Sequence, residues 1–384
     1  METRKLYYED AHAVSCQSRV LSCAQTSKGW EITLDATVFY PEGGGQACDL
    51  GTLGNVRVLD VRERGEDIIH LCDGPLEVGE TLEGKIDWQR RFDLMQQHTG
   101  EHTLSGILHR RYGFHNVGFH MGSDMVTVDF DGVIPTEDLA DIELEVNRAI
   151  WQNLAVKCWV PAPEERPGVV YRCKRALPWP VRIVQVPGFD SCACCGVHVK
   201  HTGEVGLVKI FSAIPCRGGT RMEIACGHRA YRLLNVAFDQ NRQVSQAFSA
   251  KWQETGDAAR QMNAALEAEK SRRVQLQRRI QGDICKNYVN YGNVLHFEAD
   301  LDPVQVRELA DGIAEVCGGT AAVFSGDDAR GYSFALVTRT GDLRELGKAM
   351  TSALSGRGGG KPICQQGRVA APEARIRAFF RDKF

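Results

Sequence analysis

The chain has 384 residues, of which 43% are hydrophobic and 25% charged, and its formal net charge is −3. These values are those of an ordinary globular protein, and at roughly 100–200 residues per domain the length predicts two or three domains. The sequence has neither a run of about 18 apolar residues nor a signal-peptide pattern, so we expect a cytoplasmic protein whose fourteen cysteines are reduced.

Residues 1–86 are predicted to form a small β-barrel domain. Short alternating or apolar runs occur at 29–40, 56–61 and 67–72, and glycine and aspartate turns separate them.

From Asp87 the pattern changes, and apolar residues recur at helical spacing between 91 and 112. Further elements are then expected in chain order: a strand at 125–130, a helix at 136–154, and strands at 182–186 and 205–211. Residues 87–232 are therefore predicted to form a mixed α+β core.

Residues 233–282 are predicted to form a helical linker, as one long helix or a helical hairpin. This stretch has no proline and carries apolar residues at helical spacing, which also favours a homodimer formed through the linker. From residue 283 strands and helices alternate again, so 283–384 should form a separate α/β domain. The predicted fold class is thus α+β multidomain.

Four residues have the spacing of a metal site. His98 and His102 are four apart on a predicted helix, which places both imidazoles on one face. Cys194 and His198 are also four apart. Two short segments can therefore supply three nitrogens and one thiolate to a tetrahedral zinc ion.

Other interpretations of the cysteine cluster remain open. Cys192 or Cys195 could replace Cys194 as the ligand. Cys192 and Cys195 also form a C-x-x-C pattern, which occurs in redox pairs as well.

The histidine motif has a second interpretation. Residues 98–102 match H-x-x-E-H, a zinc-protease pattern in which Glu101 would be the general base. Gly100 disfavours an uninterrupted active-site helix, because glycine costs about 1 kcal/mol relative to alanine in a helix.

A glycine run follows a predicted strand. Residues 37–46 read Thr-Val-Phe-Tyr-Pro-Glu-Gly-Gly-Gly-Gln. Glycines permit positive φ and let backbone N–H groups approach a ligand, although a tight turn needs the same residues.

Taken together, these motifs resemble a known family. The segments 37–46, 98–102, 194–198 (Cys-Cys-Gly-Val-His) and 219–223 (Gly-Thr-Arg-Met-Glu) have the order and separation of the alanyl-tRNA synthetase editing domain. The chain is still more similar to the freestanding alanyl-tRNA editing proteins of the AlaX family, whose long form ends in a DHH-associated domain. The glycine-rich segment 356–367 resembles the signature of that domain.

The resemblance implies trans-editing, the hydrolysis of the ester that joins serine or glycine to tRNA(Ala). A second site is needed because a pocket that accepts alanine cannot strongly reject a near-isostere that adds only a hydroxyl. Residues 87–232 would be the zinc-binding editing core, with one zinc ion per chain held by His98, His102, Cys194 and His198. The partner would be tRNA(Ala) mischarged with serine or glycine, bound by the DHH-associated domain at 283–384.

The resemblance also implies substrate contacts. Thr37 would bind the seryl hydroxyl, and further contacts are expected at Gly43, Gly44, Gly45, Gln46, Phe119, His120 and Arg221. The family's usual Cys-Gly-Gly-Thr-His is changed here by Cys195 and Val197. Glu101 is not a fixed family feature, and only its position beside the second ligand makes it the candidate general base.

Basic residues are concentrated toward the C-terminus. Residues 270–279 contain five basic residues and no acid, and residues 356–384 contain seven basic and two acidic ones. The near-neutral net charge therefore conceals an acidic N-terminal part and basic segments suited to phosphate contacts, among which Arg357 and Lys361 are the expected tRNA contacts.

If zinc only braces the fold, the chain would instead be a non-catalytic tRNA-binding module.

Overall fold

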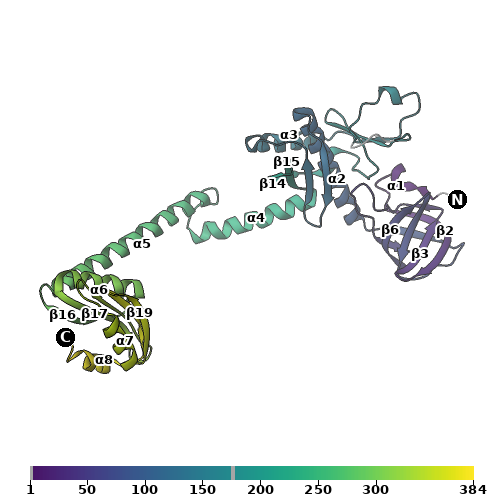
Figure 1. The fold of residues 1–384 in the computed structure, drawn as a ribbon. Helices are drawn as coiled ribbons and strands as arrows, with labels where there is room; N and C mark the ends of the chain where they lie inside the picture. The colour runs from purple at the N-terminus through teal and green to yellow at the C-terminus, as the bar shows by residue number, and fades with distance from the viewer. Residues whose placement is uncertain (1–2, 174–177) are drawn as a thin grey trace. The chain divides into compact units, whose positions relative to one another are not determined.

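The fold was analysed in a computed structural model that describes residues 3–173 and 178–384 (Figure 1). The chain divides into two compact units, Met1–Gln243 and Val244–Phe384. Both contain helices and β-strands, so the predicted α+β multidomain class is confirmed. Among the described residues, no helix combines the length and the apolar character that crossing a bilayer requires.

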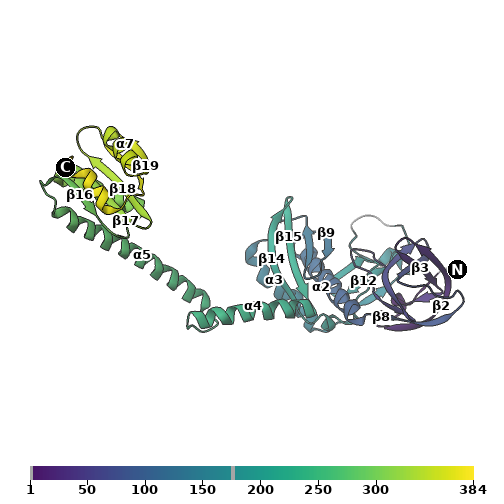
Figure 2. The same ribbon diagram turned by 90° about the horizontal axis from the view of Figure 1, so that it is seen from below.

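The first unit begins with a β-barrel. Its strands join in the order β2-β3-β7-β6-β5-β8 and close on themselves (Figure 2). Their bounds are β2 Ser15–Thr26, β3 Gly29–Leu34, β5 Gly51–Leu53, β6 Val56–Arg64, β7 Asp67–Cys72 and β8 Thr81–Ile86. Alternate residues face the interior, as in β8, where Leu82, Gly84 and Ile86 are buried and the residues between them are exposed.

Short elements border the barrel. Strand β1 (Arg4–Lys5) and helix α1 (Leu6–Glu9) precede it, and β4 (Ala36–Thr37) pairs with β1 in parallel. Strand β4 is followed by the predicted glycine run, whose Phe39 belongs to the barrel core.

Helix α2 (Trp88–Tyr112) is the central element of the remainder of the first unit. The side chain of Asp87 accepts a hydrogen bond from the backbone N–H of Arg90 and caps its start, and Gly113, with φ 77°, ends it. Most residues between Leu94 and Leu108 are buried, including several polar ones. A helix with polar side chains buried in this way needs partners for them inside the protein.

Two sheets and a second helix surround α2. One sheet has the order β14-β15-β10-β9, with bounds Asn116–Met121 for β9, Val126–Phe130 for β10, Val208–Cys216 for β14 and Gly219–Cys226 for β15. The other has the order β11-β12-β13, with bounds Lys157–Trp159, Ile183–Val186 and Asp190–Ala193. Helix α3 covers Leu139–Trp151, and 3-10 turns occur at Thr136–Asp138, Arg166–Gly168 and Thr202–Val205. The helix expected from residue 136 therefore begins as a 3-10 turn.

Gly100 does not interrupt α2, contrary to the sequence-based argument. A Cβ at Gly100 would lie 2.3 Å from the sulfur of Cys226, and one at Gly106 would lie 2.4 Å from the carbonyl oxygen of Phe189. Both glycines let neighbouring segments approach the helix closely, and burial against those segments offsets the low helix propensity of glycine.

Two helices occupy the region of the predicted linker. Helix α4 covers Gly227–Ala247 and α5 covers Thr255–Lys286. The first turn of α4 is anchored in the first unit, because Nη2 of Arg229 lies 2.6 Å from a carboxylate oxygen of Asp93. The homodimer prediction rests on the apolar spacing across this region, and Met262, Leu266 and Ile280 on α5 are among its exposed members.

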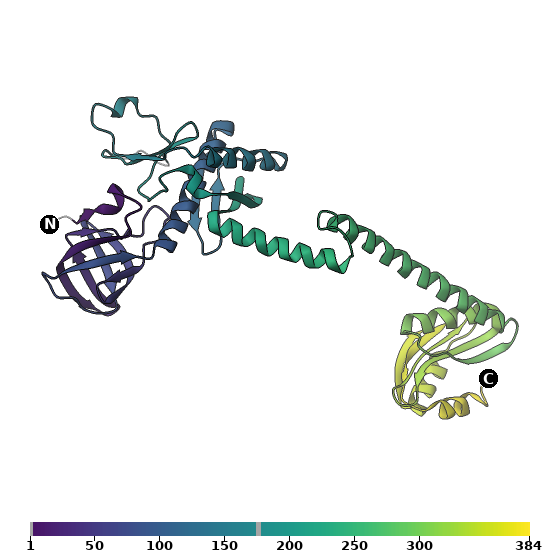
Figure 3. The ribbon, with the colours of Figure 1, turned by 180° about the vertical axis from the view of Figure 1, so that it is seen from behind.

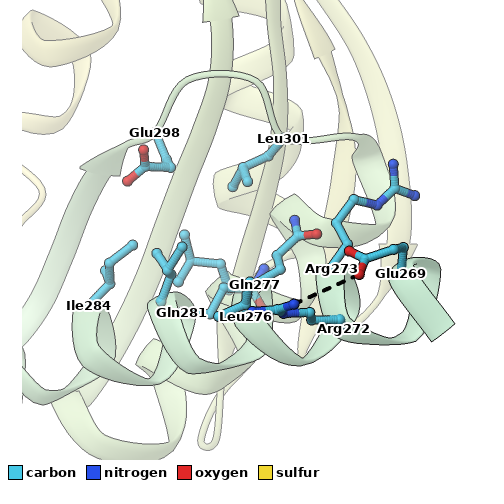
Figure 4. A pocket seen from close by; sticks show the side chains of 11 residues that line it. Glu269, Arg272, Arg273, Leu276, Gln277, Gln281, Ile284, Glu298 and Leu301 are labelled. Carbon is cyan, nitrogen blue, oxygen red and sulfur yellow. Dashed lines mark ion pairs between the residues drawn. The ribbon is translucent and has the colours of Figure 1, made fainter.

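The second unit contains a five-stranded sheet in the order β16-β17-β18-β20-β19. Figure 3 shows this unit in green to yellow. The strands are β16 Gly292–Phe297, β17 Gly318–Asp327, β18 Gly331–Thr338, β19 Gly356–Lys361 and β20 Cys364–Val369, and the helices are α6 Pro303–Cys317, α7 Arg344–Ala353 and α8 Glu373–Phe380. Alternate residues of β17 join two different core clusters, one with α6 and one with α7 and α8. These helices thus cover opposite faces of the sheet. A groove of about 630 Å³ lies within this unit, between α5 and the segment that joins β16 to α6. Leu276, Ile284 and Leu301 are among its lining residues (Figure 4).

Candidate metal centre and substrate cavity

Four potential metal ligands meet at one point in the first unit. The ligand atoms of His98, His102, Cys194 and His198 all lie within 4.8 Å of one another. The Nε2 atoms of His98 and His198 are 3.4 and 3.5 Å from the sulfur of Cys194. The two pairs with four-residue spacing are thus brought together, and the group could hold a metal ion.

Each imidazole of the group is oriented by an oxygen at its Nδ1 atom. The three pairs are His98 with Gln46 Oε1 at 2.8 Å, His198 with Thr99 Oγ1 at 3.1 Å, and His102 with Asp190 Oδ2 at 3.1 Å. Because Nδ1 is engaged in each ring, Nε2 is left to face the other ligands. Partners of this kind set the orientation of histidine ligands in metal sites.

Burial and charge adjust the protonation of the group. Burial opposes ionisation of the Cys194 thiol, but the imidazoles of His98 and His102 outweigh it and hold the pKa of Cys194 well below its usual value. Burial lowers the pKa of His198 to about 3, and the nearby His98 adds to this effect. A thiolate at Cys194 and a neutral imidazole at His198 are forms that bind metal ions. His102 differs, because burial lowers its pKa but the Cys194 thiolate and Asp190 outweigh that effect and raise it.

The loop that carries Cys194 and His198 is held close to α2. Nη1 of Arg182 donates hydrogen bonds to the carbonyls of Cys194 and Gly196, at 3.0 and 2.7 Å. A Cβ on Gly196 would lie 2.2 Å from Cε1 of His98, so a larger residue would displace either the loop or the ring. The backbone N–H of Gly196 also donates to the sulfur of Cys194 at 3.3 Å.

The other two cysteines of this segment have different surroundings. Cys195 is exposed, and its sulfur lies 4.0 Å from the hydroxyl of Tyr40. Cys192 forms a second close group with His102 and Asp190. However, Asp190 already accepts two hydrogen bonds from Arg172, at 2.7 and 3.0 Å. Cys194 is the cysteine that the geometry groups with all three histidines.

A cavity of about 760 Å³ borders the four-ligand group. The residues named from the sequence that line it are Gly44, His98, Glu101, His102, Phe119, Cys192, Cys194 and Cys195. The ring of Phe119 stacks on that of His98, with centroids 5.4 Å apart and an interplanar angle of 26°. Ligand cavities of about 300–1,000 Å³ are typical of small-molecule sites.

Other residues named from the sequence lie outside this lining. The hydroxyl of Thr37 is fully buried, 2.8 Å from Nε2 of His70. Arg221 donates two hydrogen bonds to Asp129 across the β10–β15 pair, both at 2.7 Å. His120 is exposed on β9.

The glycine run borders the cavity through Gly44. Gly43, Gly44 and Gly45 line an adjoining hollow of about 420 Å³. A Cβ at Gly45, which has φ 83°, would lie 2.6 Å from the ring of Phe119. The run therefore needs glycine both for its backbone conformation and for this close contact. In the second unit, Arg357 and Lys361 are located on the exposed strand β19.

Several residues of the site could not be identified from the sequence patterns. They are Tyr8, Thr99, Asn116, Arg172, Arg182 and Asp190. Thr99 lies within the motif at 98–102, and Asp190 lies four residues before Cys194. These positions are the only indication of a role that the sequence gives for them. Tyr8 and Arg182 contact each other, with the guanidinium 4.6 Å from the ring centroid, although they are far apart in the chain.

Two family models match parts of the chain. Residues 181–222 match the threonyl and alanyl tRNA synthetase second additional domain, and residues 2–90 match the class II (A) tRNA synthetases. The first match contains Cys194 and His198, and the second contains the glycine run.

Curated relatives extend the similarity to nearly the whole chain. The alanyl-tRNA editing protein Aarsd1-A of Xenopus laevis is 26% identical over 381 residues, which are 94% of this chain and 92% of that protein. AlaX-L of Pyrococcus horikoshii, also an alanyl-tRNA editing protein, is 32% identical over 60% of each chain. The alanine–tRNA ligase of Pyrococcus abyssi is 30% identical over 96% of this chain, which spans only 42% of the ligase.

A solved structure gives a weaker match. The C-Ala domain from Aquifex aeolicus alanyl-tRNA synthetase covers 24% of this chain with 17% identity and a TM-score of 0.21, which is too low to support an argument. The sequence relatives nevertheless confirm the resemblance to the AlaX-type alanyl-tRNA editing proteins.

Proposed function

From this relationship to the alanyl-tRNA editing proteins, we propose that the chain is a trans-acting deacylase that hydrolyses serine and glycine from mischarged tRNA(Ala). One observation carries the proposal. A buried group of three histidines and one cysteine borders a cavity, in a chain whose match to an editing protein covers more than 90% of both sequences.

We propose zinc as the metal, one ion per chain. His98, His102, Cys194 and His198 would hold it, because three imidazoles and one thiolate are a ligand set that suits zinc. The low pKa of Cys194 and the Nδ1 partners of the histidines fit this role. When bound, zinc supplies Lewis acidity and a fixed positive charge at one side of the cavity.

The protein's own residues would bind and orient the aminoacyl end of the tRNA. Phe119 and the Tyr8–Arg182 pair offer flat surfaces on which a terminal base can stack. The exposed basic residues of the second unit, including Arg357 and Lys361, would contact the tRNA backbone. Thr37 would bind the seryl hydroxyl only after it gives up its hydrogen bond to His70.

The proposal predicts selective deacylation. Purified zinc-loaded protein should hydrolyse Ser-tRNA(Ala) and Gly-tRNA(Ala). It should prefer the seryl ester to the alanyl ester by a factor of about 100 or more, because a site that binds the seryl hydroxyl rejects the alanyl analogue without it. The rates are measured with radiolabelled esters against spontaneous hydrolysis. If tRNA binds but all three esters decay at the spontaneous rate, the chain is a binding module and the proposal fails.

A second prediction concerns the residue that orients His102. Asp190→Asn removes the carboxylate 3.1 Å from Nδ1 of His102 and should lower zinc affinity about 10- to 100-fold, as loss of such partners does elsewhere. Competition with a chromophoric chelator measures the affinity. Asp73→Asn, which changes a carboxylate paired with the exposed Arg57, serves as the control and should bind zinc normally. Unchanged affinity in Asp190→Asn would rule out this orienting role.

A further inference from the structure

Glu101 is a buried carboxylate on the cavity wall. It lies on α2 between the two histidines, and only 4% of its surface is exposed. One oxygen, Oε1, accepts hydrogen bonds from the Ser105 hydroxyl and from Nδ2 of Asn116, the latter at 2.6 Å. Two donors on one oxygen hold the side chain in place on the cavity wall.

The amide that fixes Glu101 has an unused acceptor. Asn116 is 8% exposed and lines the same cavity, and its Oδ1 atom is buried with no hydrogen-bond partner among the residues that the structure describes. A buried acceptor with no donor is uncommon and indicates that a ligand or water supplies one. Within residues 3–173 and 178–384, Oε2 of Glu101 likewise receives no hydrogen bond.

Among residues 3–173 and 178–384, no cation forms an ion pair with the carboxylate of Glu101. The nearby Arg172 is committed to Asp190, with Nε at 2.7 Å from its carboxylate. Buried carboxylates are rare unless a cation or a metal ion compensates them. The wall therefore combines a negative charge and two free acceptors beside the four-ligand group.

We propose that Glu101 and Asn116 bind the α-ammonium group of the aminoacyl ester. An ammonium has three N–H donors and one positive charge, which match the two open acceptors and the unpaired carboxylate. This inference rests on the proposed deacylase function and makes Glu101 a specificity residue that distinguishes an aminoacyl ester from any uncharged acyl ester. It replaces the general-base role that the sequence pattern suggested for Glu101.

The test compares two esters on the same tRNA. Nitrous acid converts the seryl ester to the ester of glyceric acid, called the glyceryl ester below. In it an α-hydroxyl of nearly the same size replaces the ammonium. Wild-type protein should show a kcat/KM, relative to spontaneous hydrolysis, that is about 10- to 100-fold higher for the seryl ester, the range for a hydrogen bond to a charged group. Equal values for the two esters would overturn the inference without any variant. Failure to hydrolyse either ester would instead count against the proposed function.

Variants then locate the effect. Glu101→Gln keeps the size of the side chain and should lower kcat/KM for the seryl ester about 10- to 100-fold, while the glyceryl ester changes less than about 3-fold. Glu63→Gln is the control, because Glu63 lines the same cavity but is paired with Lys5 at 2.6 Å, and it should keep the wild-type ratio of the two esters. An equal loss on both esters in Glu101→Gln would identify a general base and reject ammonium binding.

A binding measurement separates recognition from hydrolysis. The amide analogue 3′-serylamino-3′-deoxyadenosine cannot be deacylated, and its affinity can be measured by calorimetry on wild type and Glu101→Gln. The variant should bind this amine about 10-fold or more weakly, and it should bind the corresponding glyceryl amide as wild type does. Unchanged affinity for the amine would contradict the inference even if hydrolysis were slower.

Discussion

His102→Ala is expected to reduce deacylation of Ser-tRNA(Ala) by at least about 100-fold and to lower the bound zinc to a small fraction of one ion per chain. The variant removes one of four ligand atoms that lie within 4.8 Å of one another. It also leaves the buried Asp190 without the imidazole at 3.1 Å. The same outcome is expected for Cys194→Ala, which removes the only anionic ligand of the group.

Zinc content by atomic emission and deacylation rates under single-turnover conditions measure the two effects. His201→Ala is the control, because this histidine is half-exposed beside Glu204 and does not belong to the four-ligand group. It should keep both zinc and activity. Full activity of a zinc-free His102→Ala protein would exclude the metal from the reaction. Peptide cleavage by wild type, abolished in Glu101→Gln, would instead favour the protease interpretation.

Arg91→Met is expected to destabilise the first unit by about 3–5 kcal/mol, because it leaves the carboxylate of Asp49 buried without its cation. Both side chains are fully buried. Arg91 also donates to the carbonyls of Ala11 and Val38, at 2.9 and 2.6 Å, and Asp49 accepts from the N–H of Tyr40 at 2.6 Å. One guanidinium thus joins α2 to the segments on both sides of the glycine run.

Urea unfolding followed by circular dichroism measures the change. Arg57→Met, which removes an exposed ion pair with Asp73, is the matched control and should cost no more than about 1 kcal/mol. Adding Asp49→Leu to Arg91→Met should restore part of the lost stability, since no unpaired charge then remains. A loss below about 1 kcal/mol in Arg91→Met alone would show that water or a rearrangement compensates Asp49.

Much of the local structure follows from periodicity in the sequence. The spacing of His98 and His102 predicts their common face on a helix, and α2 places both in the ligand group. The spacing of Cys194 and His198 likewise predicts a second pair. Such patterns are visible because helix geometry repeats every few residues, whatever the rest of the fold does.

Which of the three cysteines lies with the histidines could be decided only from the tertiary structure. The sequence favours Cys194 by its spacing from His198 but leaves Cys192 and Cys195 open as replacements, whereas the loop held by Arg182 places Cys194 with the three histidines. The Gly100 argument failed for the same reason, because the close packing of Cys226 that offsets its cost comes from a distant strand.

What the sequence by itself determined is therefore the candidate ligand residues, their spacing and the α+β class, because these depend on local composition and period. Only the tertiary structure decided that Thr37 is bonded to His70, that Asp190 orients His102, and that Asn116 is next to Glu101. Each of these contacts joins residues 15 to 88 positions apart. No local pattern encodes them, since they arise only when separate strands and helices pack against one another.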